Sequence, residues 1–361
     1  MRLTWFPVFF AAACAPPVTK MNGAGRVPEA SPERAPPPVR SVTAVLADAP
    51  TSLASPVATT DPSHFPPADV APPYAKSAAP GDGHFTTFGD AAKGERTAVE
   101  PPIVMRTVLH PHPESRWVTV TVAAIDLRRI ALELVPGTED LRWANLPVSA
   151  ESGLVKASDR AALAFVTNGG FQPKHGHWGL VANGVVVSRP REDGCTIAVD
   201  AKLGVRIAPW TELPEAAREA ATLRQTPPCL VDEGAVHPSL LAGKDKPWAG
   251  HTTDLRTRRR SAMGIDRTGE ILFYAVGEEA EPRWLAEGLR LAGAAYAAEL
   301  DINWYWTRFV LFGEKGEGEV GLRVTSTLIS KMEHLETSYV ERASTRDFFY
   351  GVLRATAGPT P

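Results

Sequence analysis

Residues 294–306 read AAYAAELDINWYW, and this stretch decides both the predicted fold and the candidate site. Positions 296–300 form an apolar run typical of a buried strand, and Asp301 and Asn303 follow at its end. Polar groups placed after buried strands usually line a cleft. Three other segments carry polar residues at similar predicted strand ends: FVTNGGF at 165–171, RQTPPCLVDEG at 224–234 and TRRRSAMGIDRTGEILFYAV at 257–276.

Outward from this stretch, apolar and β-branched runs predict more strands, and helical spacing predicts two helices. The helix at 282–291 begins with Pro282, which suits a first helical turn, and gives way at Gly293 to the strand at 296–300. The remaining elements are strands at 117–125, 130–135, 162–167, 196–200, 262–266 and 270–276, a hairpin at 180–188 that turns at Asn183-Gly184, and a helix at 213–223. One strand-helix-strand unit among many hairpins predicts an α+β domain with a large, mixed, strand-rich sheet and a few packed helices.

The composition divides the chain of 361 residues into three parts. About half of the 33 prolines lie between residues 14 and 103, in segments such as PERAPPPVR and FPPADVAPPYAKSAAPGDG. Such segments supply too little apolar surface to offset the entropy lost on ordering. We therefore expect a signal peptide at 1–14, a disordered tether rich in proline and alanine at 15–104, and a single folded domain at 105–355, which is long enough for one sizeable core.

The N-terminus has the features of an export signal. Arg2 precedes an apolar run at 3–10, and three alanines lead to Cys14. This run is too short to span a bilayer as a permanent helix. Small residues before a cysteine, with a long flexible tract after it, look like a bacterial lipoprotein signal. We therefore predict that Cys14 is lipidated and anchors the exported protein to the envelope membrane; plain secretion is the alternative.

The other two cysteines, Cys195 and Cys229, form an even pair in a chain that is expected to be exported. An oxidising compartment allows a disulfide between them. A disulfide between them would close a loop of about 34 residues. In the chain-entropy model, closing such a loop stabilises the fold by roughly 3 to 4 kcal/mol. Two small buried thiols are the competing interpretation.

Charge and motifs exclude several other function classes. The net charge is −3, and no basic helix or repeated aromatic-basic pattern occurs, which argues against a nucleic-acid binder. The G-x-S-x-G, H-E-x-x-H, P-loop and G-x-G-x-x-G signatures are missing. His175 and His177 flank Gly176, but the spacing fixes no third ligand, so we predict no metal and no cofactor. Nothing in the sequence specifies an oligomeric state.

Four segments together resemble one known family. They are TNGGF at 167–171, RQ with VDEG at 224–225 and 231–234, RSAMG at 260–264, and ELDIN at 299–303. In this order they resemble the phosphodiester glycosidase family, and the Leu-Asp-Ile-Asn form resembles a bacterial branch of it. The resemblance covers roughly residues 105 to 350. The family's commonest form has glycines after the aspartate, where this chain has Ile302 and Asn303; the departure bears on the substrate more than on the fold.

The resemblance implies a site for a glycosyl phosphate. A guanidinium can bind two phosphate oxygens and a hydroxyl can add a hydrogen bond, so Arg260 and Ser261 would hold the phosphate. Asp301 would act as nucleophile or base, and Asn168 and Asn303 would bind sugar hydroxyls. The other implied residues are Gly169 and Gly170, which allow positive φ and close approach of a ligand, Phe171 beside them, Trp306 as a stacking surface, and Glu299 and Asp232 as candidates for a second carboxylate. A structural ion pair is the competing interpretation for Arg260, and core packing is the competing interpretation for the aromatic residues at 304–306.

The sequence therefore predicts an exported, lipid-anchored hydrolase that cleaves a sugar-1-phosphodiester linkage in an envelope or extracellular glycan. Its expected partners are a carbohydrate or glycosyl-phosphate substrate and a membrane, reached through the lipid anchor, with no nucleic acid. The alternative is a catalytically inactive glycan-binding surface lipoprotein, because a fold does not guarantee an activity.

Overall fold

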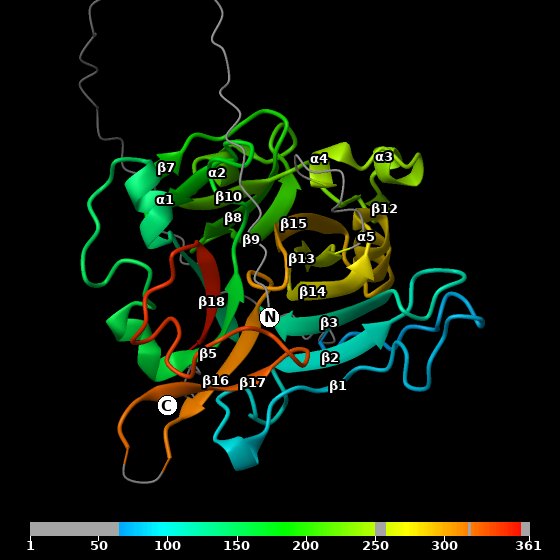
Figure 1. The fold of residues 1–361 in the computed structure, drawn as a ribbon, viewed down its shortest axis with the longest axis horizontal. Helices are drawn as coiled ribbons and strands as arrows, with labels where there is room; N and C mark the ends of the chain where they lie inside the picture. The colour runs from blue at the N-terminus through cyan, green and yellow to red at the C-terminus, as the bar shows by residue number, and fades with distance from the viewer. Residues whose placement is uncertain (1–64, 250–257, 317–318, 355–361) are drawn as a thin grey trace, which may run out of the picture. The chain divides into compact units, whose positions relative to one another are not determined.

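The computed structural model describes residues 65–249, 258–316 and 319–354 (Figure 1). Cys14, the expected signal peptide and the first part of the expected tether lie outside these residues. The described strands form three sheets and the helices are few and short, which confirms the predicted α+β class. Within the described ranges, no helix combines the length and the apolar composition that crossing a membrane requires.

The largest sheet carries the stretch that the sequence singled out. Its eight strands lie in the order β1-β2-β3-β14-β13-β15-β11-β12, and every pair is antiparallel. In that order the strands are Thr86–Thr87, Val104–Leu109, Thr119–Asp126, Ile271–Ala280, Arg258–Ile265, Tyr296–Ile302, Val231–Asp232 and Ala235–Val236. Because β14 and β15 both pair with β13, they run in the same direction, and helix α5 (Pro282–Leu291) is the crossover between them. The observed bounds of α5 are the predicted ones.

Two five-stranded sheets, also antiparallel throughout, complete the strand-rich part. One has the order β7-β6-β10-β8-β9, with strands Val185–Ser188, Leu180–Ala182, Thr222–Thr226, Cys195–Asp200 and Gly204–Pro209. The other has the order β17-β16-β5-β18-β4, with strands Leu322–Thr327, Phe309–Glu314, Leu163–Asn168, Phe348–Leu353 and Ile130–Val135. The short helices are α1 (Thr138–Trp143), α2 (Glu215–Arg218), α3 (Pro238–Leu241), α4 (Lys246–Ala249) and the 3₁₀ turns Ala91–Lys93 and Ala157–Ala162.

The core follows from the two-residue period of the strands. On β14, Leu272 and Tyr274 point into a central cluster, while Phe273 and Ala275 point to the opposite face, where they pack with α5. The central cluster gathers residues from all three sheets, so each sheet contributes one face to it. This packing fixes the end of β15, where Asp301 lies, against the neighbouring sheets.

The folded part begins earlier than the expected boundary at residue 105. Strand β1 pairs with β2, and Phe65 and Phe85 are buried in the same cluster as α5. Gly83 also donates a backbone hydrogen bond to Val108 at 2.9 Å. The physical reason is that two phenylalanines supply apolar area within a proline-rich segment, and the free edge of β2 accepts a further strand. Residues 65–104 therefore belong to the folded unit.

The expected helix at 213–223 is much shorter in the structure. Only Glu215–Arg218 is helical, because Thr222–Thr226 pairs with both β6 and β8 as strand β10. Tertiary strand pairing thus overrides the helical preference of the alanine-rich segment.

Candidate active site

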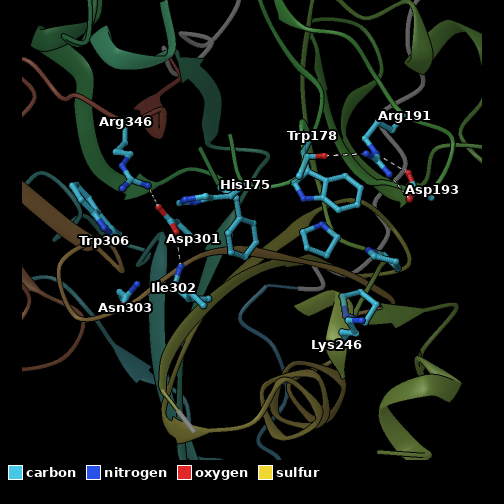
Figure 2. A pocket seen from close by; sticks show the side chains of 15 residues that line it. His175, Trp178, Arg191, Asp193, Lys246, Asp301, Ile302, Asn303, Trp306 and Arg346 are labelled. Atoms are coloured by element: carbon cyan, nitrogen blue, oxygen red, sulfur yellow. Dashed lines mark hydrogen bonds and ion pairs between the residues drawn. The ribbon is translucent and has the colours of Figure 1, made fainter. Parts of the chain in front are cut away.

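A cavity of about 750 Å³ opens at the end of β15 (Figure 2). Four residues of the predicted set line it, namely Phe171, Asp301, Asn303 and Trp306. The sequence analysis had assigned no role to the other side chains that matter most here: Trp178, Arg191, Asp193, Lys246 and Arg346. The cavity therefore brings together segments from all three sheets.

Asp301 is the carboxylate that the fold delivers to this cavity. Its backbone N–H donates to Gly169 at 2.9 Å, which ties the end of β15 to the segment after β5. One carboxylate oxygen, Oδ2, accepts a hydrogen bond from Arg346 Nη1 at 2.7 Å, and the other accepts one from the backbone N–H of Ile302. Burial raises the pKa of Asp301 to about 7, although Arg346 acts to lower it. Such a carboxyl group can exchange a proton near neutral pH.

Arg346 lines the cavity and was not among the residues predicted from the sequence. Its guanidinium stacks on the ring of Trp306, with Cζ 3.8 Å from the ring centroid, so the pair forms one wall of the cavity. Nη1 bonds Asp301, and within the described residues neither Nη2 nor the buried Nε has a hydrogen-bond partner. Arg346 therefore has donors left for an anionic ligand.

Gly169 and Gly170, the two glycines of the NGGF segment, were expected to allow positive φ and close approach of a ligand, and the structure gives them a different role. Neither Gly169 nor Gly170 has a positive φ. A Cβ on Gly169 would lie 2.1 Å from Oδ2 of Asp347, and one on Gly170 would lie 2.7 Å from Cζ of Arg224. Arg224 and Asp347 form a fully buried ion pair, with Nε and Oδ2 2.7 Å apart. The space beside both glycines is thus occupied by this ion pair, and neither glycine lines the large cavity.

Asn168 and Ser261 are buried and do not line the large cavity; Asn168 lines a small recess of about 20 Å³ beside Asp301. The Nδ2 of Asn168 donates to Ser261 Oγ and to the next backbone carbonyl, and Oδ1 accepts from the hydroxyl of Tyr274 at 2.7 Å and from the backbone N–H of Arg308 at 2.9 Å. Ser261 in turn donates to the backbone carbonyl of Asp301 at 2.8 Å. These polar groups are satisfied internally, so both residues position Asp301 rather than bind substrate.

Arg260 and Glu299 also lie apart from the cavity, contrary to the predicted phosphate and carboxylate roles. Their side chains are fully buried and form an ion pair, with Nη1 and Oε1 2.7 Å apart. Arg260 also donates to the backbone carbonyls of Trp248 and Ala280. Burial raises the pKa of Glu299 to about 7, while Arg260 lowers it. The observed contacts of Arg260 are therefore those of a structural ion pair, which was the competing interpretation.

Asp232 lies too far along the sheet to join the site. Its neighbour Val231 pairs with Ala297, four residues before Asp301, which corresponds to about 13 Å along the strand. Asp232 and Ala235 form the last pair of the short β11-β12 hairpin at the sheet edge. The second-carboxylate role proposed for Asp232 is therefore not supported by its position.

Asn303 directly follows β15 and has an unusual backbone conformation. Its φ is 93°, a left-handed value that asparagine tolerates better than most side chains. Its Oδ1 accepts a hydrogen bond from Arg258 Nη1 at 3.1 Å. Of the three aromatic residues that follow, Trp304 and Tyr305 are exposed and Trp306 faces the cavity, so none of them is a core residue.

The opposite wall of the cavity holds the remaining charges. Arg191 binds Asp193 through two hydrogen bonds, at 2.7 and 2.8 Å, and its guanidinium lies over the ring of Trp178 (Figure 2). Lys246 is exposed at the rim and has no ion-pair partner within the described part of the chain. The lining thus carries one more cationic than carboxylate side chain, which favours an anionic ligand.

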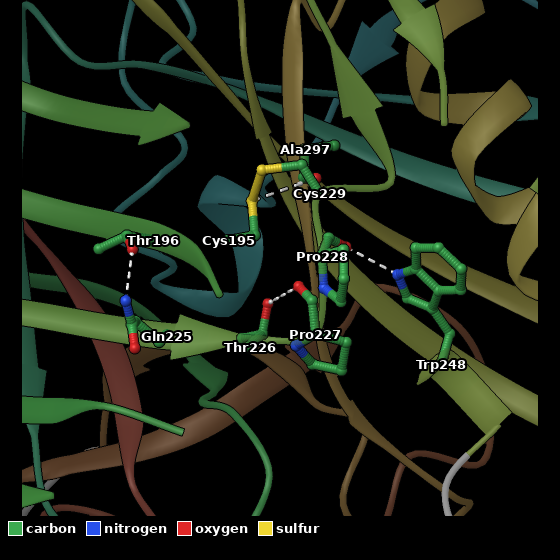
Figure 3. The surroundings of a disulfide bond; sticks show 9 residues. All are labelled: Cys195, Thr196, Gln225, Thr226, Pro227, Pro228, Cys229, Trp248 and Ala297. Carbon is green, nitrogen blue, oxygen red and sulfur yellow. Dashed lines mark hydrogen bonds between the residues drawn. A yellow bond between two sulfur atoms is a disulfide. The ribbon is translucent and has the colours of Figure 1, made fainter. Parts of the chain in front are cut away.

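A disulfide between Cys195 and Cys229 supports this wall (Figure 3). The Cα atoms are 4.7 Å apart, and the bond closes a loop with a sequence separation of 34. Asp193 lies two residues before one cysteine, and Pro227 and Pro228 lie directly before the other; all three residues line the cavity. The bond therefore joins two segments that shape the same wall. Within the described residues, no three His, Cys, Asp or Glu side chains come together as a metal site.

The comparisons with known proteins are distant. No protein-family model matches the chain, and no curated protein does. The catalytic domain of zebrafish N-acetylglucosamine-1-phosphodiester alpha-N-acetylglucosaminidase, auto-inhibited by its pro-peptide, is 14% identical; the match covers 72% of this chain and 86% of that one, with a TM-score of 0.42.

Two other solved structures have a similarly low sequence identity to this chain. A hypothetical protein from Synechocystis is 13% identical, with 70% of this chain and 62% of that chain covered and a TM-score of 0.43. A protein of Burkholderia pseudomallei described as exported is also 13% identical, with 71% and 76% covered and a TM-score of 0.34. We draw no functional conclusion from these likenesses.

Proposed function

We propose that this chain is an exported hydrolase that cleaves a sugar-1-phosphodiester linkage in an envelope or extracellular glycan. The observation that carries the proposal is Asp301, a buried carboxyl group with a pKa raised to about 7, held by Arg346 at the wall of an aromatic cavity. The resemblance of the surrounding segments to the phosphodiester glycosidase family supports the same reaction.

Each part of such a substrate has a matching surface in the cavity. The faces of Trp178 and Trp306 are suited to a pyranose ring. Arg346, through its unpaired donors, and Lys246 at the rim are suited to the phosphate. These two cations replace Arg260 and Ser261 in the phosphate-binding role, because the latter are buried away from the cavity.

The reaction places modest demands on acid catalysis. A phosphate monoester leaves as a stable anion, so the site has to hold the phosphate and stabilise an oxocarbenium-like anomeric carbon. Asp301, once ionised, attacks that carbon or activates a water beside it. Either role requires the carboxylate form, and the raised pKa makes its ionisation sensitive to pH near neutrality.

A glycan-binding module is the second candidate, and one observation favours it. Glycosidases commonly use two carboxyl groups, yet Glu299 pairs with Arg260 away from the cavity and Asp193 is held by Arg191. Among the described residues, Asp301 and Asp193 are the carboxylates that line the cavity. A site with only Asp301 available can bind a sugar phosphate without cleaving it.

The two candidates separate in a hydrolysis assay. Residues 15–361 are incubated with a panel of sugar-1-phosphodiesters, and release of reducing sugar and of phosphomonoester is measured. We expect at least one member to be cleaved at the sugar-phosphate bond. Binding of panel members without cleavage of any would favour the binding module.

Membrane attachment through Cys14 is a separate part of the proposal. It is supported by the run of small residues before Cys14. Expressed in a bacterium with its signal, the protein should incorporate labelled palmitate and partition into detergent. The Cys14→Ser variant should do neither, and unchanged labelling in this variant would show that the anchor lies elsewhere.

A further inference from the structure

A second cavity, of about 300 Å³, lies beside the candidate active site. Trp306 belongs to the lining of both cavities, so the two adjoin at this residue. The far side of the second cavity is formed by the segment from Glu333 to Thr345, which includes Tyr339 and Arg342. The proposed function leaves this cavity without a role.

A small recess of about 20 Å³ shares lining residues with both cavities. Asp301 and Arg346 line both the recess and the active-site cavity. Arg308, Tyr339 and Ser344 line both the recess and the second cavity. The recess has room for about one water molecule, and the shared residues place Asp301 and Arg346 next to the second cavity. A substrate bound at Asp301 can therefore place its leaving-group end over Trp306, toward the second cavity.

The second cavity is basic. Arg308 and Arg342 line it, and Glu333 is the one carboxylate in its lining. The Arg342 side chain has no hydrogen-bond or ion-pair partner within the residues that the structure describes. Arg308 is held in place because it donates to the hydroxyl of Tyr339 and to the carbonyl of Tyr305, at 2.9 Å each, while its Nε is buried without a partner in the same part of the chain.

Tyr339 adds a conformational observation. Its φ is 70°, and its side chain is almost fully buried. A bulky residue in the left-handed region is an outlier, and such outliers cluster at ligand sites. This backbone conformation holds the phenol against Arg308 at the junction of the recess and the second cavity.

We propose that this second cavity is an anion subsite for the leaving-group side of the substrate. It would take a phosphate or carboxylate carried by the organic group of the phosphomonoester that leaves, so the preferred substrate has a second negative charge beyond the scissile phosphodiester. This inference rests on the proposed function, since the order sugar, scissile phosphate and leaving group follows from placing the sugar in the larger cavity. Arg342 supplies the contact, because its guanidinium can bind two anion oxygens.

The first test measures binding and does not depend on turnover. Glycerol 3-phosphate is titrated into residues 15–361 by calorimetry, with glycerol as the neutral comparison. Arg342→Gln should weaken binding of glycerol 3-phosphate about tenfold, as expected for the loss of a charge-assisted contact. Arg218→Gln is the matched control, because Arg218 is an exposed residue of α2 and does not line the cavities. Absence of binding, equal binding in all three proteins, or binding that depends on Lys246 instead of Arg342 would overturn the subsite.

The second test addresses the leaving group. Two sugar-1-phosphodiesters are compared: in one the scissile phosphate carries a propyl group, and in the other it carries a propyl group that ends in a second phosphate. The unaltered protein should have a lower KM for the second, and Arg342→Gln should reduce that preference about tenfold. An unchanged preference in the variant would overturn the inference. If neither compound is cleaved, the hydrolase proposal fails, and the binding titration still decides whether the anion subsite exists.

Discussion

Two ion pairs on β15 have the same chemistry but different surroundings. Glu299 meets Arg260 and Asp301 meets Arg346, each across 2.7 Å, and the two carboxyl groups are two residues apart on one strand. The first pair is fully buried and is braced by backbone carbonyls. The second pair lies at the wall of a cavity, and its arginine has a donor left unpaired in the described structure.

The difference shows why a strand-end carboxylate is not in itself a functional residue. Burial raises the pKa of both carboxyl groups to about 7, so the perturbed pKa does not distinguish them. What distinguishes them is access to a ligand. We therefore infer that the pair at Glu299 holds β13 to β15, whereas the pair at Asp301 is available for chemistry.

The largest expected effect is on stability, at the buried pair. Arg260→Ala leaves Glu299 without its cation in a fully buried position and should cost about 3 to 5 kcal/mol of the free energy of unfolding. Arg346→Ala, at the partly accessible pair, should cost less than half as much. Urea denaturation of both variants measures the difference. Equal losses would show that the two pairs play the same structural role.

The next effect is on turnover, at the accessible pair. Asp301→Asn keeps the shape of the side chain and removes its charge, so it should reduce kcat about a hundredfold to a thousandfold while binding stays within about tenfold. Glu299→Gln is the matched variant on the same strand. Its folded fraction should turn over substrate within about twofold of the unaltered protein. Loss of activity in folded Glu299→Gln, or full activity in Asp301→Asn, would reverse the roles of the two pairs.

The pH dependence should separate stability from activity. Burial raises the pKa of Asp140, Glu299 and Asp301 to about 7, above their ordinary values, so the folded protein binds more protons than the unfolded chain between about pH 4 and 7. The stability that these groups contribute is fully present below about pH 4 and is lost as the pH rises through 7. Turnover should rise over the same range, because Asp301 acts as a carboxylate.

Urea denaturation and kcat/KM, both measured from pH 5 to pH 8, test these opposite trends. The Asp301→Asn variant should show a weaker loss of stability with pH, since one of the three groups no longer titrates. Stability that rises from pH 5 to pH 8 would contradict the shifted pKa values.

The elements of the fold were largely predictable from local pattern. The period of apolar residues located β4 and α5 at their observed bounds, and Asn183-Gly184 marked the observed turn between β6 and β7. The start of the fold was not predictable in this way. Residues 65–104 are proline-rich, and their order depends on pairing with the distant edge of β2 and on burial of two phenylalanines. The division of the strands into three sheets likewise depends on long-range pairing.

The candidate site was predictable only in part. Asp301 and Trp306 follow a recognisable strand, and both line the cavity. No sequence motif marks Arg346. It reaches the site because antiparallel pairing places the start of β18 beside the end of β5, where Phe348 pairs with Asn168. The polar pair Arg346-Asp347, directly before an apolar strand, was the available signal. Which of Arg260 and Arg346 meets the cavity depends on the direction of each side chain, and residue type does not determine that.

The smallest predicted effect tests the accessible arginine itself. Arg346→Lys keeps the positive charge but loses the planar fork that allows one cation to contact both Asp301 and a phosphate, and it loses the stacking on Trp306. Binding of a sugar-1-phosphodiester should therefore weaken about tenfold, or roughly 1.4 kcal/mol, with stability nearly unchanged. Arg260→Lys is the control at the buried pair, and it should lower stability and leave binding by the folded protein unaffected. If Arg260→Lys weakens ligand binding and Arg346→Lys does not, the phosphate is held by the arginine of the sequence motif, and the cavity beside Arg346 serves another ligand.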